Sequence, residues 1–170
     1  MFEKLSPIMK IEFIQMSIEH ARENMGIYNY YIENSLAAYP DKVMPVEYFG
    51  KFIELTKGYP AYTIYDAAKI IGFCFLRPYN PHSTFKECAE ITYFINKDYT
   101  GMGVGKTALN KLESEAASMG IKTILASISS ENPQSLSFHQ NNGFKQCGRF
   151  ERIITKWGKP FDIIWMQKNI

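Results

Sequence analysis

Hydrophobic residues recur every three or four positions in three segments of the chain, a spacing that predicts amphipathic helices. Ser17 precedes the first of these segments as an N-cap residue, and Gly58 and Gly120 follow the other two as helix stops. Asn132 as N-cap and Pro133 in the first turn predict a fourth, short helix. The predicted helices cover residues 18–34, 45–57, 104–119 and 133–142.

Short apolar runs rich in β-branched and aromatic residues predict seven strands. A polar turn at 66–69 joins the second and third strands, and the stretch 77–87, with two prolines, is expected to be an exposed loop. This order of elements predicts one α/β domain of the layered α+β kind, with a largely antiparallel sheet. The predicted strands cover residues 11–16, 61–65, 70–76, 89–95, 121–128, 144–150 and 161–167.

Composition excludes several classes of protein. The chain is 46% hydrophobic and has a net charge of +2 from scattered residues, so neither nucleic acid nor membrane is expected as a partner. Its three cysteines are isolated, so neither a disulfide framework nor a metal site is expected. The first thirty residues lack an unbroken apolar run, and no stretch reaches the ~20 apolar residues of a membrane span. A cytoplasmic protein is therefore expected.

The stretch TGMGVGKTAL at 100–109 lies between a predicted strand and a predicted helix, where free N–H groups and the helix dipole favour an anion. A P-loop would need a glycine where this chain has Thr100. A dinucleotide fingerprint fits Gly103, Gly105 and Ala108, but that motif belongs to the first strand of a parallel βαβ array. The remaining alternatives are the pyrophosphate loop of an acetyl-coenzyme A enzyme and a turn without a ligand.

Two motifs resemble those of the GNAT N-acetyltransferase superfamily. YTGMGVGKTAL at 99–109 is similar to its pyrophosphate loop through Gly103 and Gly105, and ENPQSLSFHQNNGF at 131–144 follows one helix and one strand later. Four further stretches resemble the branch of phosphinothricin and methionine-sulfoximine N-acetyltransferases, so the resemblance covers nearly the whole chain from about residue 10. They are IYNYYIENSLAAY (27–39), LRPYN (76–80), AEITYFI (89–95) and ITKWGKPFDIIWMQK (154–168).

The resemblance implies a single GNAT domain over residues 1–170, with 1–9 as a flexible extension. It implies a mixed, mostly antiparallel sheet of about seven strands, flanked by about four helices and splayed between the fourth and fifth strands. It also implies a homodimeric enzyme that transfers the acetyl group of acetyl-CoA to the primary amine of a small amino acid or analogue, without a metal. A domain that binds acyl-CoA without turnover is the alternative. Thr100 replaces the loop's usual Gln or Arg, and His82 and Lys86 replace a frequent Arg before the fourth strand.

In such an enzyme, backbone amides of the glycine turn hold the pyrophosphate, and the pantetheine arm lies along the fourth strand like an added strand. Asn132 matches the residue that contacts this arm, and an N-cap role for it is compatible with that contact. The residues expected to bind coenzyme A are Phe94, Ile95, Met102, Gly103, Val104, Gly105, Lys106, Thr107, Asn132 and Ser135.

Glu90 matches the general base of this branch. An α-amino group with a pKa near ~7.7–8.0 is mostly protonated at neutral pH, so a carboxylate, or a water that it holds, must take the proton. The alternative for Glu90 is a solvated charge at a strand end. His139 stands where many members have a tyrosine that protonates the leaving thiolate, and its alternative is a structural role. The residues expected to line the amine pocket are Tyr30, Arg77, Tyr79 and Tyr93.

Overall fold

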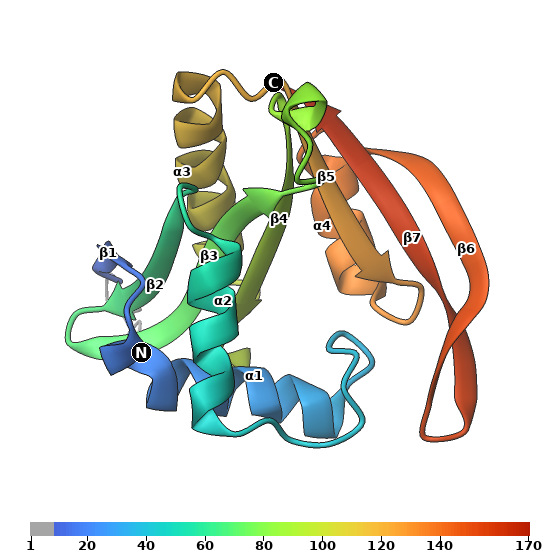
Figure 1. Cartoon of the computed structure of the whole chain (residues 1–170). Helices are drawn as coiled ribbons and strands as arrows, with labels where there is room; N and C mark the ends of the chain where they lie inside the picture. The colour runs from blue at the N-terminus through green and yellow to red at the C-terminus, as the bar shows by residue number, and fades with distance from the viewer. Residues whose placement is uncertain (1–8) are drawn as a thin grey trace, which may run out of the picture.

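The computed structural model describes residues 9–170, so nearly all of the expected extension over 1–9 lies outside the described residues. Seven strands form one sheet in the order β1-β2-β3-β4-β5-β7-β6 (Figure 1). Neighbouring strands are antiparallel except β4 and β5, which confirms the expected mixed, mostly antiparallel sheet. The strands are β1 (Ile11–Gln15), β2 (Ala61–Asp66), β3 (Lys69–Pro78), β4 (Cys88–Ile95), β5 (Thr123–Ser129), β6 (Lys145–Lys156) and β7 (Lys159–Asn169).

Helices cover both faces of the sheet (Figure 1). On one face, Met25 and Phe49 join Phe73 and Phe75 of β3 in a buried cluster. The α-helices of the described residues are α1 (Ala21–Asn34), α2 (Phe49–Leu55), α3 (Val104–Ser118) and α4 (Pro133–Asn141). Four short 3-10 turns accompany them: η1 (Ile18–His20), η2 (Val46–Tyr48), η3 (Ser83–Phe85) and η4 (Lys97–Tyr99).

The opposite face carries α3 and α4. Val104, Ala108, Leu112 and Ala116 of the predicted apolar stripe of α3 are buried there, whereas Met119, which also fits that spacing, is 46% exposed. Gly120 follows α3 with a φ of 78°, and the Ile121 amide donates to the Ala116 carbonyl at 3.0 Å. This is the glycine-dependent helix end that the sequence predicts.

The sheet opens between β4 and β5. The two strands pair in parallel over three residues only, from Cys88 opposite Thr123 to Glu90 opposite Leu125. Beyond that point they diverge, and β5, β7 and β6 lean away from β1–β4 (Figure 1). The expected splay between the fourth and fifth strands is therefore confirmed.

Several element boundaries differ from the prediction. β3 continues through Pro78, so Arg77 lies on a strand rather than in the expected loop. β6 and β7 are longer than expected and meet at Trp157 and Gly158, whose φ values of 52° and 73° give the tight hairpin turn that suits strand twist. Ser17 precedes a 3-10 turn rather than α1 itself, and its side chain makes no capping bond within the described residues.

Candidate active site

The glycine stretch forms the turn into α3. Gly101 and Gly103 have φ values of 74° and 88°, a region that glycine enters without a Cβ penalty. Gly103 is the N-cap of α3, and the amides of Val104, Gly105 and Lys106 stand in the first turn, where the helix offers them no acceptor. These amides and the positive end of the helix dipole favour an anion.

The side chains of this turn divide into one anchor and several exposed groups. Val104 is 1% exposed and fixes the turn to the core. Met102, Lys106 and Thr107 are exposed. A Cβ on Gly105 would meet only ordinary contacts, at 3.5 Å or more, so packing does not require a glycine there.

β4 has an open edge beyond Glu90, its last residue paired with β5. Along a strand, the backbone groups of successive residues point to opposite edges. The Asn96 amide donates to the Ile71 carbonyl of β3, so the backbone N–H and C=O groups of the even-numbered residues of β4 point toward β3. The Glu87 carbonyl accepts from the Thr123 amide at the start of β5, so the backbone N–H and C=O groups of the odd-numbered residues of β4 point toward the splay.

This alternation corrects one expectation. A Cβ on Gly72 of β3 would lie 2.6 Å from the Phe94 carbonyl oxygen, so the Phe94 backbone faces β3 and not the open edge, where it was expected to pair with the pantetheine arm. The backbone groups of Tyr93 and Ile95 point toward the open edge instead. The Ile95 carbonyl accepts a 2.5 Å hydrogen bond from the hydroxyl of Tyr31, whose pKa burial raises to about 12. The Ile95 amide thus remains the group that could bind an added strand.

Glu90 is 7% exposed and lies where β4 leaves β5, so the structure contradicts the alternative of a solvated charge. Its Oε2 accepts a 2.6 Å hydrogen bond from Arg77 Nη2, which comes from the opposite position on β3. Burial raises the pKa of the Glu90 carboxyl, and the Arg77 charge and hydrogen bond partly offset that rise. A carboxylate with a raised pKa is a stronger proton acceptor than an exposed one.

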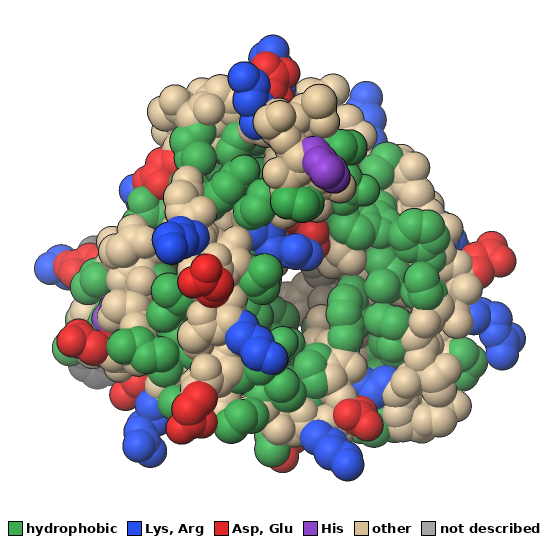
Figure 2. All heavy atoms as spheres, viewed as in Figure 1, with side chains coloured by type: hydrophobic (Ala, Val, Ile, Leu, Met, Phe, Trp, Pro, Cys, Tyr) green, Lys and Arg blue, Asp and Glu red, His purple; other side chains and the backbone are tan. Residues whose placement is uncertain are grey.

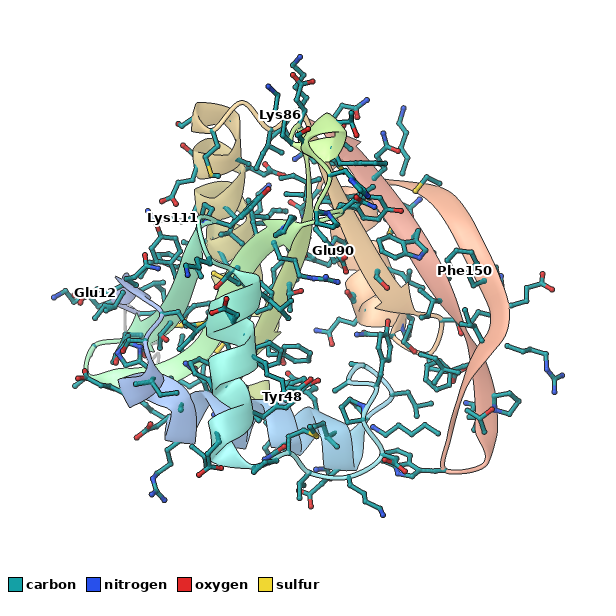
Figure 3. All side chains as sticks on the ribbon, in the orientation of Figure 1. Glu12, Tyr48, Lys86, Glu90, Lys111 and Phe150 are labelled. Carbon is teal, nitrogen blue, oxygen red and sulfur yellow. The ribbon has the colours of Figure 1, made fainter. Side chains whose placement is uncertain are left out.

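Glu90 belongs to the face covered by α1 and α2, which Figure 2 shows hollowed between the two halves of the sheet. Figure 3 places its side chain near the middle of this face. Burial raises the pKa of the Tyr39 phenol; Ser127 of β5 acts to lower this pKa, and the Glu90 charge acts to raise it. Tyr79 packs edge-on against Trp165 of β7, with ring centroids 6.0 Å apart. Both halves of the sheet thus contribute to one site.

His139 of α4 is 2% exposed, on the other side of the sheet. Its Nδ1 lies 2.7 Å from the Ser135 carbonyl oxygen and therefore carries the proton, while Nε2 accepts a short hydrogen bond from the Tyr93 hydroxyl. Burial lowers the pKa of His139, which keeps the ring neutral. Asn132 Oδ1 accepts from the Ser135 amide at 3.1 Å, so its predicted N-cap role is confirmed.

Tyr30 does not join the Glu90 site. It lines a separate pocket of about 310 Å³ with Asn96 and Lys97, and Lys97 Nζ lies 5.4 Å from its ring centroid. That pocket is six residues along β4 from Glu90, about 20 Å at 3.3 Å per residue. The expectation for Tyr30 is therefore not supported by its position.

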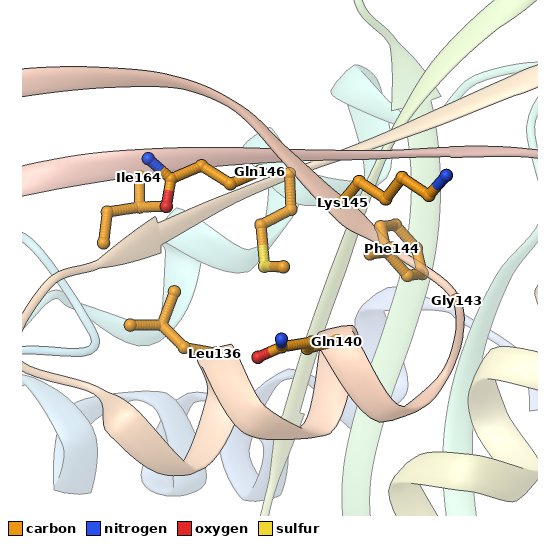
Figure 4. Close-up of a pocket in the computed structure, with 8 residues that line it drawn as sticks. Leu136, Gln140, Gly143, Phe144, Lys145, Gln146 and Ile164 are labelled. Carbon is orange, nitrogen blue, oxygen red and sulfur yellow. The ribbon is translucent and has the colours of Figure 1, made fainter.

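A larger groove of about 590 Å³ lies between α4 and the β6–β7 hairpin, where Leu136, Ile164 and Met166 line it (Figure 4). It does not contain Glu90 or the α3 turn. Among residues 9–170, no group of three His, Cys, Asp or Glu side chains is placed to bind a metal. No helix in the described range is long and apolar enough to span a membrane.

The paired motifs and the splay agree with a comparison against family models, in which residues 16–144 match the acetyltransferase (GNAT) family. The chain belongs to the GNAT acetyltransferase family. It is 26% identical over 162 residues to the L-amino acid N-acyltransferase MnaT of Escherichia coli strain K12, which covers 91% of this chain and 94% of that protein.

A second relative of this GNAT chain is the L-methionine sulfoximine/L-methionine sulfone acetyltransferase of Pseudomonas paraeruginosa, 29% identical over 115 residues and 67% of each protein. The crystal structure of a phosphinothricin acetyltransferase from Sinorhizobium meliloti, in complex with AcCoA, matches with a TM-score of 0.87 and 21% identity. It covers 95% of this chain and 89% of that one. The match shows that the fold is the GNAT fold.

Sequence reasoning missed two residues near the site of this GNAT domain, Ser127 and Trp165, and one buried lysine, Lys156. Ser127 lies in an apolar strand pattern that gave no polar signal. Trp165 lies in the stretch that resembles the branch's closing hairpin, which assigns it no role. Lys156 ends β6 with 1% exposure, and a lysine is rarely so buried. The sequence around Lys156 could not reveal this burial, because it depends on a contact with α1 more than a hundred residues away.

Proposed function

We propose that this GNAT protein transfers the acetyl group of acetyl-CoA to the primary amine of a small amino acid or amino-acid analogue. Glu90 carries the proposal: it is a buried carboxylate with a raised pKa, beside the hollow and at the start of the splay. The anion site of α3 lies near the other end of the same open edge, five residues or about 17 Å along β4. One extended acetyl-CoA molecule could therefore bind the anion site of α3 and place its thioester near Glu90.

Three features support coenzyme A at this edge. The free amides of Val104, Gly105 and Lys106 suit a pyrophosphate, and the Lys106 ammonium adds a positive charge beside them. Packing does not require glycine at 105, whereas a ligand close to the backbone would. The Ile95 amide and the Tyr93 backbone would pair with the arm as strand addition does elsewhere.

The amine would approach from the hollow. An ammonium group must lose a proton before it attacks the thioester carbonyl, and Glu90 takes that proton directly or through one water. Arg77, paired with Glu90 and one-third exposed, would hold the carboxylate of an amino-acid substrate. Tyr79 and Trp165 would form an apolar wall for its side chain.

The leaving thiolate would be formed at the open edge of β4. His139 has both ring nitrogens engaged and is buried, so its geometry favours a role through Tyr93 rather than direct protonation. Burial raises the pKa of Tyr93 well above its ordinary value, which keeps its phenol protonated. His139 would therefore hold the Tyr93 ring on the α3 and α4 side of the sheet, and only the Tyr93 backbone would reach the open edge.

Ligand-induced thermal stabilisation and thiol release test the proposal together. A ligand at one hundred times its dissociation constant adds about 2.7 kcal/mol to the free energy of unfolding. We expect acetyl-CoA to stabilise the protein and magnesium-ATP and NAD to have no effect. Free thiol should then appear only when an amino acid or analogue is added.

Stabilisation by acetyl-CoA without thiol release from any amino acid, polyamine or peptide would show a binding domain instead. Stabilisation by ATP alone would contradict the coenzyme site. Homodimerisation and a cytoplasmic location are further proposals, and sedimentation at micromolar concentration tests the first.

A further inference from the structure

Lys156 is a buried lysine that the acetyl-transfer chemistry does not use. It is 1% exposed and ends β6, next to the tight turn of the β6–β7 hairpin. Figure 1 shows the tip of this hairpin close to the loop that follows α1, although about 120 residues separate them in the chain. A buried ammonium needs compensating acceptors, so its partners reveal what it holds.

Those partners are three main-chain carbonyls. Lys156 Nζ donates to the carbonyl oxygens of Ile32, Ser35 and Ala38 at 2.6, 2.9 and 2.8 Å. Ile32 lies in the last turn of α1, where a cation also interacts favourably with the helix dipole. The other two belong to residues 35–44, which we name the acceptor loop. One ammonium thus fixes both the end of α1 and the path of the chain beyond it.

The far end of the acceptor loop is fixed separately. The Asn29 side chain accepts from the Met44 amide and donates to its carbonyl, each at 2.9 Å. Between these two anchors stands Tyr39, which is half-buried and directly follows Ala38, one of the residues whose carbonyl Lys156 holds. The Glu90 charge contributes to the raised pKa of Tyr39. The loop therefore extends over the hollow from the α1 side, and Lys156 ties it to the opposite half of the splayed sheet.

We propose that Lys156 is a positioning residue for the amine acceptor: through the three carbonyls it holds the acceptor loop, and with it Tyr39, against the Glu90 side of the hollow. Lys156 does not touch the reacting atoms. Losing its contacts would leave Glu90, Arg77 and the coenzyme turn in place but would release one wall of the amine pocket. The effect on the amine rests on the proposed function, whereas the effect on the loop does not.

Lys156→Met tests this inference, because methionine keeps most of the side-chain volume and removes all three donors. We expect the KM for L-methionine sulfoximine to rise about tenfold or more, since small misplacements of a bound group have large kinetic effects. The dissociation constant of acetyl-CoA should stay within about twofold. Hydrogen exchange should show faster amide exchange in residues 35–44 of the free protein.

Lys159→Met is the matched control. Lys159 lies in the same hairpin, is 56% exposed in its side chain and pairs with Glu131, so its loss should change neither the KM nor the loop. Tyr39→Ala should raise the same KM, and Lys156→Met should add little to it in the double variant. If Lys156→Met does not fold, Lys156→Gln, which retains two N–H donors, carries the same measurements.

Several outcomes would overturn the inference. Unchanged exchange in residues 35–44 in the Lys156 variant would show that the lysine does not hold the loop, whatever the activity. Equal losses of amine and acetyl-CoA binding would show a general structural role. Additive effects of the Lys156 and Tyr39 changes would show that the lysine does not act through Tyr39. A wild-type protein without transfer to any amine would refute the proposed function and leave the exchange result to decide the inference.

Discussion

Replacing Glu90 with glutamine changes one atom and removes the proposed base. A general base contributes about 10²–10⁴ in rate, so kcat should fall by that factor, equivalent to about 2.7–5.4 kcal/mol at 1.36 kcal/mol per tenfold. The acetyl-CoA dissociation constant should not change, because the amides that would hold the pyrophosphate belong to α3 and not to the Glu90 pair.

The same change also weakens the Arg77 ion pair, and that cost must be separated from catalysis. The Arg77 side chain is 34% exposed, so the lost charge-assisted hydrogen bond costs about 1–2 kcal/mol, below the range for fully buried pairs. At about 2–4 °C per kcal/mol for a domain of this size, Tm should fall by about 2–8 °C. Thermal unfolding of the variant measures this loss separately from the loss in kcat.

Glu113→Gln is the matched control. Glu113 of α3 pairs with Lys168 of β7 at 2.5 Å, with side chains 18% and 20% exposed. The same chemical change there should lower Tm similarly and leave kcat unaltered. Kinetics of thiol release at saturating acetyl-CoA, together with thermal unfolding of both variants, measure the difference. A Glu90→Gln kcat within threefold of wild type, or equal losses in both variants, would refute the reasoning.

Three further predictions follow from the site. Glu90 must be ionised, so activity should rise with pH through its raised pKa, and Arg77→Met should move this limb of the pH–rate profile to higher pH. Since folded His139 has a lowered pKa, the unfolded chain binds the extra proton, and urea unfolding should show stability falling below about pH 6.5, a loss that His139→Phe abolishes. Gly103→Ala should cost about 1–2 kcal/mol of backbone strain and weaken acetyl-CoA binding up to about thirtyfold by calorimetry, whereas Gly58→Ala, equally strained at φ 82°, should not.

For Glu90 the folded state is the stronger proton binder. Its contribution to stability is therefore complete at low pH and is lost as the pH rises through its folded pKa. Arg77→Met should make that loss larger, because the guanidinium no longer opposes the rise. If neither the pH–rate profile nor the pH dependence of stability changes in Arg77→Met, the proposed effect of Arg77 on the pKa of Glu90 is contradicted.

Much of the fold was predictable because its signals are local. The stripe of α3 and the glycine at 120 each depend on neighbours within one or two helical turns. β6 was only partly predictable: both of its faces are largely exposed, so apolar residues do not alternate along it. Its extent depends on pairing with β7 and on the Trp157–Gly158 turn.

The site was less predictable than the fold. Arg77 and Glu90 are thirteen residues apart, and only the β3–β4 register makes them partners. Successive residues of β4 point their backbone groups to opposite edges, and only the structure shows which residues point toward the splay. The Phe94 backbone points toward β3 and not toward the expected ligand. Lys156 depends on a contact between the two halves of the chain, which no local pattern indicates.

The central claim is that the acetyl group of acetyl-CoA is transferred to an amino-acid amine. Mass spectrometry of the amino acid after incubation with the wild-type protein tests it most directly, with L-methionine sulfoximine as acceptor. The account predicts one N-acetylated amino acid for each free thiol released, and almost none with Glu90→Gln. Thiol released without an acetylated amino acid, or the acetyl group recovered only on peptide amines, would contradict it.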